Sequence, residues 1–235
     1  MARTAAQCVA QPATGRTMKP DQAFRHVLLD IEGTTCPVNF VSEVLFPYAS
    51  RQLRPYLKEH QWEEPISNLL QEVEEEMGKD QVEQDPSAAA LLHPQGSERL
   101  ERICRYLESL IRADRKVTPL KDLQGRIWEE GYRRRELIAP LFADVPDALQ
   151  RWRARGLELS VYSSGSVHAQ KLLYAHTEAG DLSHLFNHWF DTRIGAMNDR
   201  SSYETIAAAI STKPQETLFV SDAIAELQAA NKAGM

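Results

Sequence analysis

The sequence has few cysteines, no long apolar run and no excess of positive charge, and each shortage excludes a class of protein. Its 3 cysteines, Cys8, Cys36 and Cys104, lie far apart without a Cys-x-x-Cys pair, which excludes a disulfide framework and a cysteine zinc site. No apolar run approaches the roughly 18 residues of a membrane-spanning helix. The net charge of −6 argues against nucleic-acid or membrane-surface partners, because both favour a basic face. We therefore expect a protein of the reducing cytoplasm with neither partner.

The composition that remains is that of an ordinary globular protein, with 43% hydrophobic and 26% charged residues. Residues 1–20 are small and polar and include no acidic residue, which predicts a disordered leader. A transit peptide, or a start codon misassigned upstream of Met18, are the alternatives. At the other end, Gly234 closes a helical pattern where a further strand would be expected, so the sequence is either clipped or lacks an edge strand.

The apolar pattern divides the rest of the chain into two kinds of segment. A short buried strand is predicted over 24–30, and helical patterns without a convincing strand follow between about 40 and 135, at 63–78, 97–114 and 118–132. Helices and strands then alternate, with helices at 145–156, 166–180, 202–211 and 223–234 and strands at 157–164, 188–192 and 217–222. Such alternation is typical of an α/β fold with a doubly wound parallel sheet.

Polar side chains follow three of the predicted strands. Asp30 and Glu32 come after the first, Ser163 and Ser164 after the second, and Asp222 after the last. The carboxyl ends of parallel strands meet at one crevice, where ligands bind. Carboxylates there suit Mg²⁺ and a phosphate, and an aspartate can attack phosphorus directly. The alternative is that the acidic pair only caps a turn or a helix.

Six sequence motifs resemble the enolase-phosphatase (acireductone synthase) family of the haloacid dehalogenase-like hydrolase superfamily. They are "DIEGT" at 30–34, "VLFPYA" at 44–49, "WEEGY" at 128–132, "VYSSGSVHAQKLL" at 161–173, "FDTRIGA" at 190–196 and "LFVSDAIAELQAA" at 218–230. The superfamily usually has a second aspartate where this family and this chain have glutamate. The resemblance covers residues 24–235 and implies a Rossmann-like core, 21–38 and 136–235, with an inserted, mobile, all-helical cap, 39–135.

The resemblance also implies the roles of three acidic residues. Asp30 would be the nucleophile and a Mg²⁺ ligand. Glu32 would offer its backbone carbonyl to the metal and its side chain to proton transfer. Asp222 would be a further metal ligand. The role of Glu226 follows from its spacing instead: it lies one helical turn after Asp222, on the same face, and would support the metal directly or through water.

The phosphate site implied by the resemblance consists of Ser163, Ser164 and the Gly165 amide. The alternative is that these three residues only form the N-terminal cap of the following helix, although a helix N-terminus is itself an anion site.

Two departures from the family pattern concern charge and backbone freedom. Met197 stands where the family has a lysine, and removing such a cation would cost roughly 10²–10³-fold in rate. Of the two nearby arginines, Arg200 is a better candidate than Arg193 to replace the missing lysine. The alternative is that Arg200 is a solvent-exposed residue without a role in the site. Arg135 replaces a glycine and Ile138 a lysine near the cap junction, which puts cap closure or substrate contact in doubt.

The predicted function is that of a Mg²⁺-dependent enolase-phosphatase acting as a monomer in the cytoplasm. The resemblance implies that 2,3-diketo-5-methylthiopentyl-1-phosphate is enolised and then hydrolysed through an aspartyl-phosphate, giving the acireductone of methionine salvage and phosphate. Two alternatives stay open: a phosphatase of another small phosphorylated metabolite, and an impaired homologue that binds a phosphometabolite without turning it over.

Overall fold

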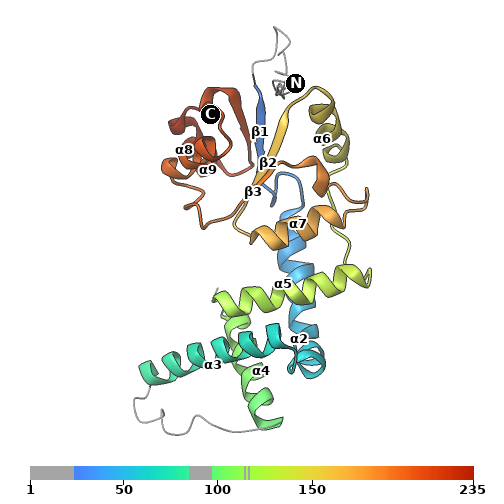
Figure 1. Ribbon diagram of the computed structural model, residues 1–235, viewed down its shortest axis with the longest axis vertical. Coiled ribbons are helices and arrows are strands. Elements are labelled where there is room, and N and C mark those ends of the chain that lie inside the picture. Colours follow the sequence, from blue (N-terminus) through green and yellow to red (C-terminus); the bar gives the residue numbers. More distant parts are fainter. Residues whose placement is uncertain (1–23, 85–96, 114, 116) are drawn as a thin grey trace, which may run out of the picture.

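The computed structural model describes residues 24–84, 97–113, 115 and 117–235, so the predicted leader lies outside the described residues. Figure 1 shows an elongated molecule with a parallel sheet and its helices at one end and a block of helices at the other. Within the described ranges, no helix combines the length and the apolar character needed to cross a membrane.

The sheet has four parallel strands in the order β3-β2-β1-β4, with bounds β1 His26–Leu29, β2 Glu158–Tyr162, β3 His188–Phe190 and β4 Thr217–Val220. Val27 is in register with Leu159 of β2 and Leu218 of β4. The chain runs from β1 outward to β3 and then returns to the other side of β1. This reversal of strand order is the doubly wound arrangement that the alternating pattern predicts.

Helices cover both faces of the sheet (Figure 1), with bounds α6 Val145–Ala154, α7 Val167–Ala175, α8 Arg200–Ala209 and α9 Ile224–Ala233. Successive strand residues point to opposite faces. Accordingly, Val27 and Leu29 pack in one apolar cluster with Leu149 of α6, whereas Leu28 packs in a second cluster with Tyr203 of α8. Burial on both faces explains why β1 is a continuous apolar run in the sequence.

The region between β1 and α6 is helical, as predicted, with bounds α1 Val38–Phe40, a π-helical turn η1 Val41–Leu45, α2 Phe46–His60, α3 Glu64–Gln84, α4 Ser97–Arg112 and α5 Thr118–Arg133. We call these helices the helical block. Leu53, Leu70 and Leu107, from three of its helices, are each at most 1% exposed. Arg54 of α2 donates to Glu108 of α4 (Nε to Oε1, 2.6 Å), which ties the helices together.

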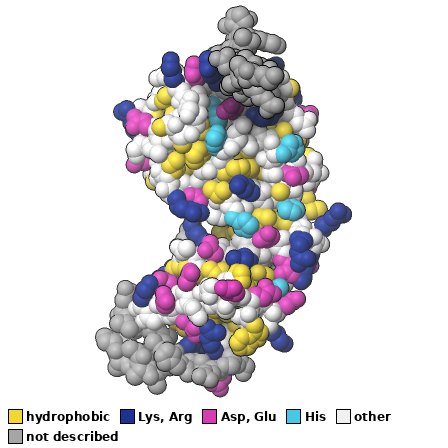
Figure 2. Space-filling model, in the orientation of Figure 1, with side chains coloured by type: hydrophobic (Ala, Val, Ile, Leu, Met, Phe, Trp, Pro, Cys, Tyr) yellow, Lys and Arg dark blue, Asp and Glu magenta, His cyan; other side chains and the backbone are white. Residues whose placement is uncertain are grey.

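Contacts between α5 and α7 join the helical block to the sheet half of the molecule. The Tyr132 ring stacks on His176 with centroids 4.9 Å apart, and His168 Nε2 lies 3.4 Å from Glu129 Oε2. Figure 2 shows that the surface narrows between the two halves and that charged side chains of both signs are scattered over this face. The α5 helix therefore lies across the end of the sheet half that carries α7.

The predicted helix over 166–180 is too long, because α7 ends at Ala175. Beyond it, Thr177 Oγ1 donates to the Gly180 carbonyl at 2.6 Å, and Ala139 N donates to the His176 carbonyl at 2.8 Å. These hydrogen bonds stabilise a turn in place of another helical turn.

Candidate active site

Asp30 lies directly after β1, at the point where the strand order reverses. Its side chain is almost fully buried, and Thr34 Oγ1 donates to Asp30 Oδ2 at 3.2 Å. The Asp222 amide, just beyond β4, donates in turn to Thr34 Oγ1 at 3.0 Å. One threonine hydroxyl thus connects the ends of two neighbouring strands and holds Asp30 and Asp222 in the same crevice.

Gly33 allows the turn after β1 to approach Asp222 closely. Its φ of +79° lies in the left-handed region, and a Cβ placed on it would lie 2.1 Å from Asp222 Oδ2. Since no carbon can occupy that position, only glycine fits between this turn and the carboxylate.

The acidic side chains at the strand ends influence one another electrostatically. Burial, and after it the charges of Glu226 and Asp222, raise the pKa of Asp30 to about 7. Burial, together with Asp222 and Glu32, also raises the pKa of Glu226, whose Oε2 accepts a hydrogen bond from Ser221 at 2.9 Å. A cluster of carboxylates that disfavour one another's charge and offer only oxygen ligands fits a hard divalent cation.

The serine turn after β2 is not simply a helix cap. Ser166 is the N-cap of α7 and accepts from the Ala169 amide at 3.2 Å, so the capping role proposed for Ser163 to Gly165 belongs to Ser166 instead. Gln170, which the sequence analysis did not single out, fixes the turn by donating to the Gly165 carbonyl at 2.8 Å. Ser163, Ser164 and the Gly165 amide lie at the N-terminal end of α7, where an anion can bind, although the Gly165 amide also donates a long hydrogen bond to Ser163 Oγ at 3.4 Å.

A cavity of about 240 Å³ lies between the serine turn and the helical block. Glu32 and Ser163 to Ser166 line one end of it. The helical block contributes an apolar wall that includes Val41, Leu45, Phe46, Leu110, Leu120 and Trp128. The helical block also contributes polar residues, Arg115, Lys121 and Gln124, so the cavity has a mainly apolar lining with polar groups from both sides.

Of the predicted site residues, Asp30, Glu32, Asp222 and Glu226 influence one another electrostatically at the strand ends. Only Glu32 of the four lines the cavity, and among the described residues these carboxylates are not a group whose oxygens already lie within metal-binding distance of one another. Arg200 is not among the residues that line the cavity; its Nε donates to Glu204 at 2.7 Å on an exposed part of α8. Its predicted role in phosphate binding stays a prediction. Arg193 pairs with Asp191, with Nε and Oδ2 3.1 Å apart.

The structure shows the surroundings of the residues that depart from the expected family pattern. Met197 packs against the apolar cluster that contains Tyr203, whose hydroxyl donates to the Met197 carbonyl at 2.6 Å. Arg135 has a φ of +59°, in the left-handed region that suits glycine, and Ile138 is exposed. The first departure removes a cation, and the second strains the backbone where the helical block ends.

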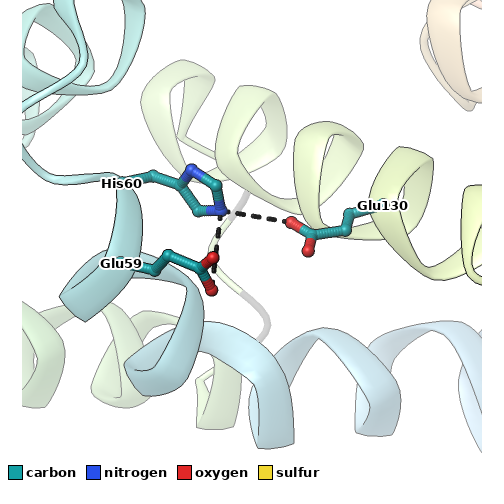
Figure 3. Close-up of side chains that lie close together, drawn as sticks. All are labelled: Glu59, His60 and Glu130. Carbon is teal, nitrogen blue, oxygen red and sulfur yellow. Dashed lines mark ion pairs between the residues drawn. The ribbon is translucent and has the colours of Figure 1, made fainter.

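A separate cluster of Glu59, His60 and Glu130 lies within the helical block (Figure 3). His60 Nε2 is 3.3 Å from Glu130 Oε2, while His60 Nδ1 is 2.7 Å from Glu63 Oε1. Arg134 also pairs with Glu130, so the cluster is an ion-pair network that already contains a cation. Burial raises the pKa of Cys36 to about 12, which favours the protonated, unreactive thiol.

Comparison with known proteins gives consistent matches over nearly the whole chain. The model of the haloacid dehalogenase-like hydrolases matches residues 24–234. Enolase-phosphatase E1 of Parasynechococcus marenigrum (strain WH8102) is 51% identical over 213 residues, covering 91% of this chain and 87% of that protein. Enolase-phosphatase E1 of Aquifex aeolicus (strain VF5) is 45% identical over 210 residues, covering 89% of this chain and 86% of that protein.

Solved structures agree with the observed fold. The UTR4 protein of Saccharomyces cerevisiae has a TM-score of 0.73 at 32% identity and covers 90% of this chain and 87% of its own. CbbY of Rhodobacter sphaeroides, solved in complex with phosphate, has a TM-score of 0.53 at 15% identity, and the match covers 90% of this chain and 84% of CbbY. The second likeness concerns the fold alone.

Proposed function

Because the chain belongs to the haloacid dehalogenase-like hydrolases, and within them to the enolase-phosphatases, we propose that it enolises and hydrolyses 2,3-diketo-5-methylthiopentyl-1-phosphate. The products are the acireductone of methionine salvage and inorganic phosphate. The observation that carries this proposal is the buried Asp30 at the strand reversal, under the electrostatic influence of Asp222 and Glu226. Asp30 follows β1, whose neighbour β2 ends at the serine turn, because Leu29 is in register with Val161. This arrangement joins a nucleophile, a cation site and an anion site.

Asp30 acts as the nucleophile in the phosphatase step. Its carboxylate oxygen forms a bond to phosphorus as the bond to the ester oxygen breaks, and Glu32 delivers a proton to the leaving oxygen. Water then attacks phosphorus, which releases inorganic phosphate and restores the Asp30 carboxylate. Ser163, Ser164 and the Gly165 amide hold the phosphoryl oxygens by hydrogen bonds. Arg200 would first have to leave Glu204 to join them.

Mg²⁺ is the cation that we propose for Asp30, the Glu32 carbonyl, Asp222 and Glu226. When bound, it supplies positive charge that favours the ionised form of Asp30 and neutralises phosphoryl oxygens. The raised pKa of Asp30 indicates how much the cluster needs such a charge, because without it the nucleophile would be partly protonated near neutral pH.

Glu32 is the residue we assign to the enolase step, because it lines the cavity beside the serine turn. The Glu32 carboxylate takes a proton from the carbon that bears the phosphate ester, and a water molecule gives a proton to the neighbouring ketone oxygen. Glu32 keeps the proton it took until it passes it to the leaving ester oxygen, and the hydroxide left by the water attacks phosphorus in the last step. The apolar wall of the cavity accommodates the methylthioalkyl tail of the substrate through residues such as Phe46, Leu110 and Trp128.

The helical block acts as a mobile cap in this proposal. Residues 39–135 form the cap, and residues 21–38 and 136–235 form the catalytic core. Both parts of one chain line the cavity, which supports a monomer as the working unit. We place the enzyme in the cytoplasm, acting on a small phosphorylated diketone rather than on nucleic acid or membranes.

The test is phosphate release from the diketo phosphate with and without Mg²⁺, while enediol absorbance is followed in the same sample. We expect Mg²⁺-dependent release, preceded by enediol formation, and a loss of at least about 10³-fold in Asp30→Asn. No release from folded, Mg²⁺-loaded protein would refute the proposal and favour an impaired phosphometabolite-binding homologue, for which Met197 is the structural argument.

A further inference from the structure

One face of α5 lines the cavity and carries two polar side chains, Lys121 and Gln124, that the predicted site does not use. Lys121, Gln124 and Trp128 lie three and four residues apart, which places them on the same side of the helix. All three line the cavity, and Ser163 to Ser166 line its core side. The helical block therefore presents a cation and an amide to the same cavity as the anion-binding turn.

Gln124 is buried without a protein partner. Its side chain is only 6% exposed, yet among the described residues none forms a hydrogen bond with its amide. The amide atoms are not among the fully buried side-chain atoms that lack a partner in the described residues, so they keep contact with the cavity, where water or a ligand can complete their hydrogen bonds. An unpaired amide that lines a cavity is expected where a bound molecule completes its hydrogen bonds.

Lys121 is the cation best placed to act on an anion in this cavity. Within the described part of the chain, only Arg115 and Lys121 bring positive charge to the cavity lining. Arg115 is held by Asp80, with Nη2 and Oδ1 3.1 Å apart, whereas no ion pair to another described residue is found for Lys121. Met197, packed in its apolar cluster, offers no charge from the core side.

We propose that this face of α5 binds the polar end of the substrate, with Lys121 neutralising the phosphate and Gln124 hydrogen-bonding to the oxygens of the diketone. The inference rests on the proposed function, because that function supplies the phosphate and the adjacent carbonyl groups. An amide suits two neighbouring carbonyl oxygens, since its NH₂ group can donate two hydrogen bonds. The cap in this way selects phosphorylated diketones as well as covering them.

Lys121→Met and Lys121→Arg test the charge, with Lys58→Met, an exposed lysine of α2 outside the cavity lining, as the matched control. Binding of inorganic phosphate to the Mg²⁺-loaded protein is followed by tryptophan fluorescence, and KM and kcat are measured with the diketo phosphate. We expect Lys121→Met to weaken phosphate binding and raise KM by about 10–100-fold, while Lys121→Arg and Lys58→Met stay within a few-fold of wild type. Unchanged phosphate binding in Lys121→Met would overturn the assignment.

Gln124→Leu separates ligand binding from a structural role. If the amide serves the substrate, the variant loses about tenfold in kcat/KM yet unfolds at the same or a higher temperature, because the substitution removes no hydrogen bond to protein and adds an apolar side chain to a partly apolar cavity. A lower unfolding temperature with unchanged KM would show a structural role and overturn the proposal for Gln124. Phosphate binding needs no turnover, so an inactive wild type would refute the proposed function while the Lys121 comparison still decides this inference.

Discussion

Replacing Gly33 by alanine tests how closely the turn after β1 has to approach Asp222. The added Cβ would lie 2.1 Å from Asp222 Oδ2, whereas contacts shorter than 3.0 Å essentially never occur, so the carboxylate has to move by about 1 Å. A misplacement of about 1 Å in a site that relies on geometry can cost 10²-fold in rate. We therefore expect Gly33→Ala to lose about 10²-fold in phosphate release and to require 10–100-fold more Mg²⁺.

Gly180→Ala is the matched control because it shares the backbone conformation without the steric contact. Its φ is +90°, compared with +79° for Gly33, and a Cβ at Gly180 would meet nothing within 4 Å. A left-handed conformation costs an alanine about 1–2 kcal/mol, partly offset by the lower entropy of its unfolded chain, so both variants should lose about 1 kcal/mol of folding stability from the backbone. That loss corresponds to about 2–4 °C in unfolding temperature for a chain of this size.

The assay compares both variants with wild type in thermal unfolding and in phosphate release over a Mg²⁺ titration. Only Gly33→Ala should need more Mg²⁺, because only this variant displaces a proposed metal ligand. If the two variants require the same Mg²⁺ concentration, Asp222 does not hold the cation and the geometric argument is wrong.

Two further predictions concern stability. Arg135→Gly should raise the free energy of unfolding, measured in urea, by up to about 1 kcal/mol, because glycine tolerates a φ of +59°. The control, Arg133→Gly in the last turn of α5, should lower the free energy of unfolding by about 1 kcal/mol. If the two substitutions change stability equally, the backbone at Arg135 is not strained. Burial, followed by the charges of His188 and Arg153, lowers the pKa of His26 from 6.5 to about 4. As the pH drops from 6.5 to 4, the unfolded chain therefore binds a proton at His26 that the folded chain does not, and the stability of the folded chain falls. That loss amounts to about 3 kcal/mol. In the His26→Gln variant, which keeps a polar partner for Ser160 Oγ, the free energy of unfolding should not show this fall with pH. If wild type and variant lose stability equally between pH 6.5 and 4, His26 does not cause the loss.

Local sequence patterns predicted most of the fold. The apolar run of β1 predicted a short buried strand, and the alternation after residue 135 predicted the doubly wound sheet. The position of Asp30 and Asp222 directly after strands predicted that they share a crevice, because parallel strands end at one edge of the sheet. Each of these predictions depends on neighbouring residues and on a general rule of topology.

Helix α2 was not singled out in the sequence analysis, and its packing explains why. Its buried residues include Leu53 and Leu57, but Pro47 and Pro55 lie within it, and an internal proline usually argues against a helix. Contacts with α4 and α5 compensate for the hydrogen bond that the proline cannot make.

The sequence by itself determined the fold class, the family and the acids at the strand ends, because these follow from local periodicity and short motifs. Only the tertiary structure decided that Ser166 rather than Ser163 caps α7, that Arg200 pairs with Glu204, and that Lys121 and Gln124 line the cavity. The direction in which a helix side chain points relative to a distant strand depends on how the helices pack, and no local pattern encodes that packing.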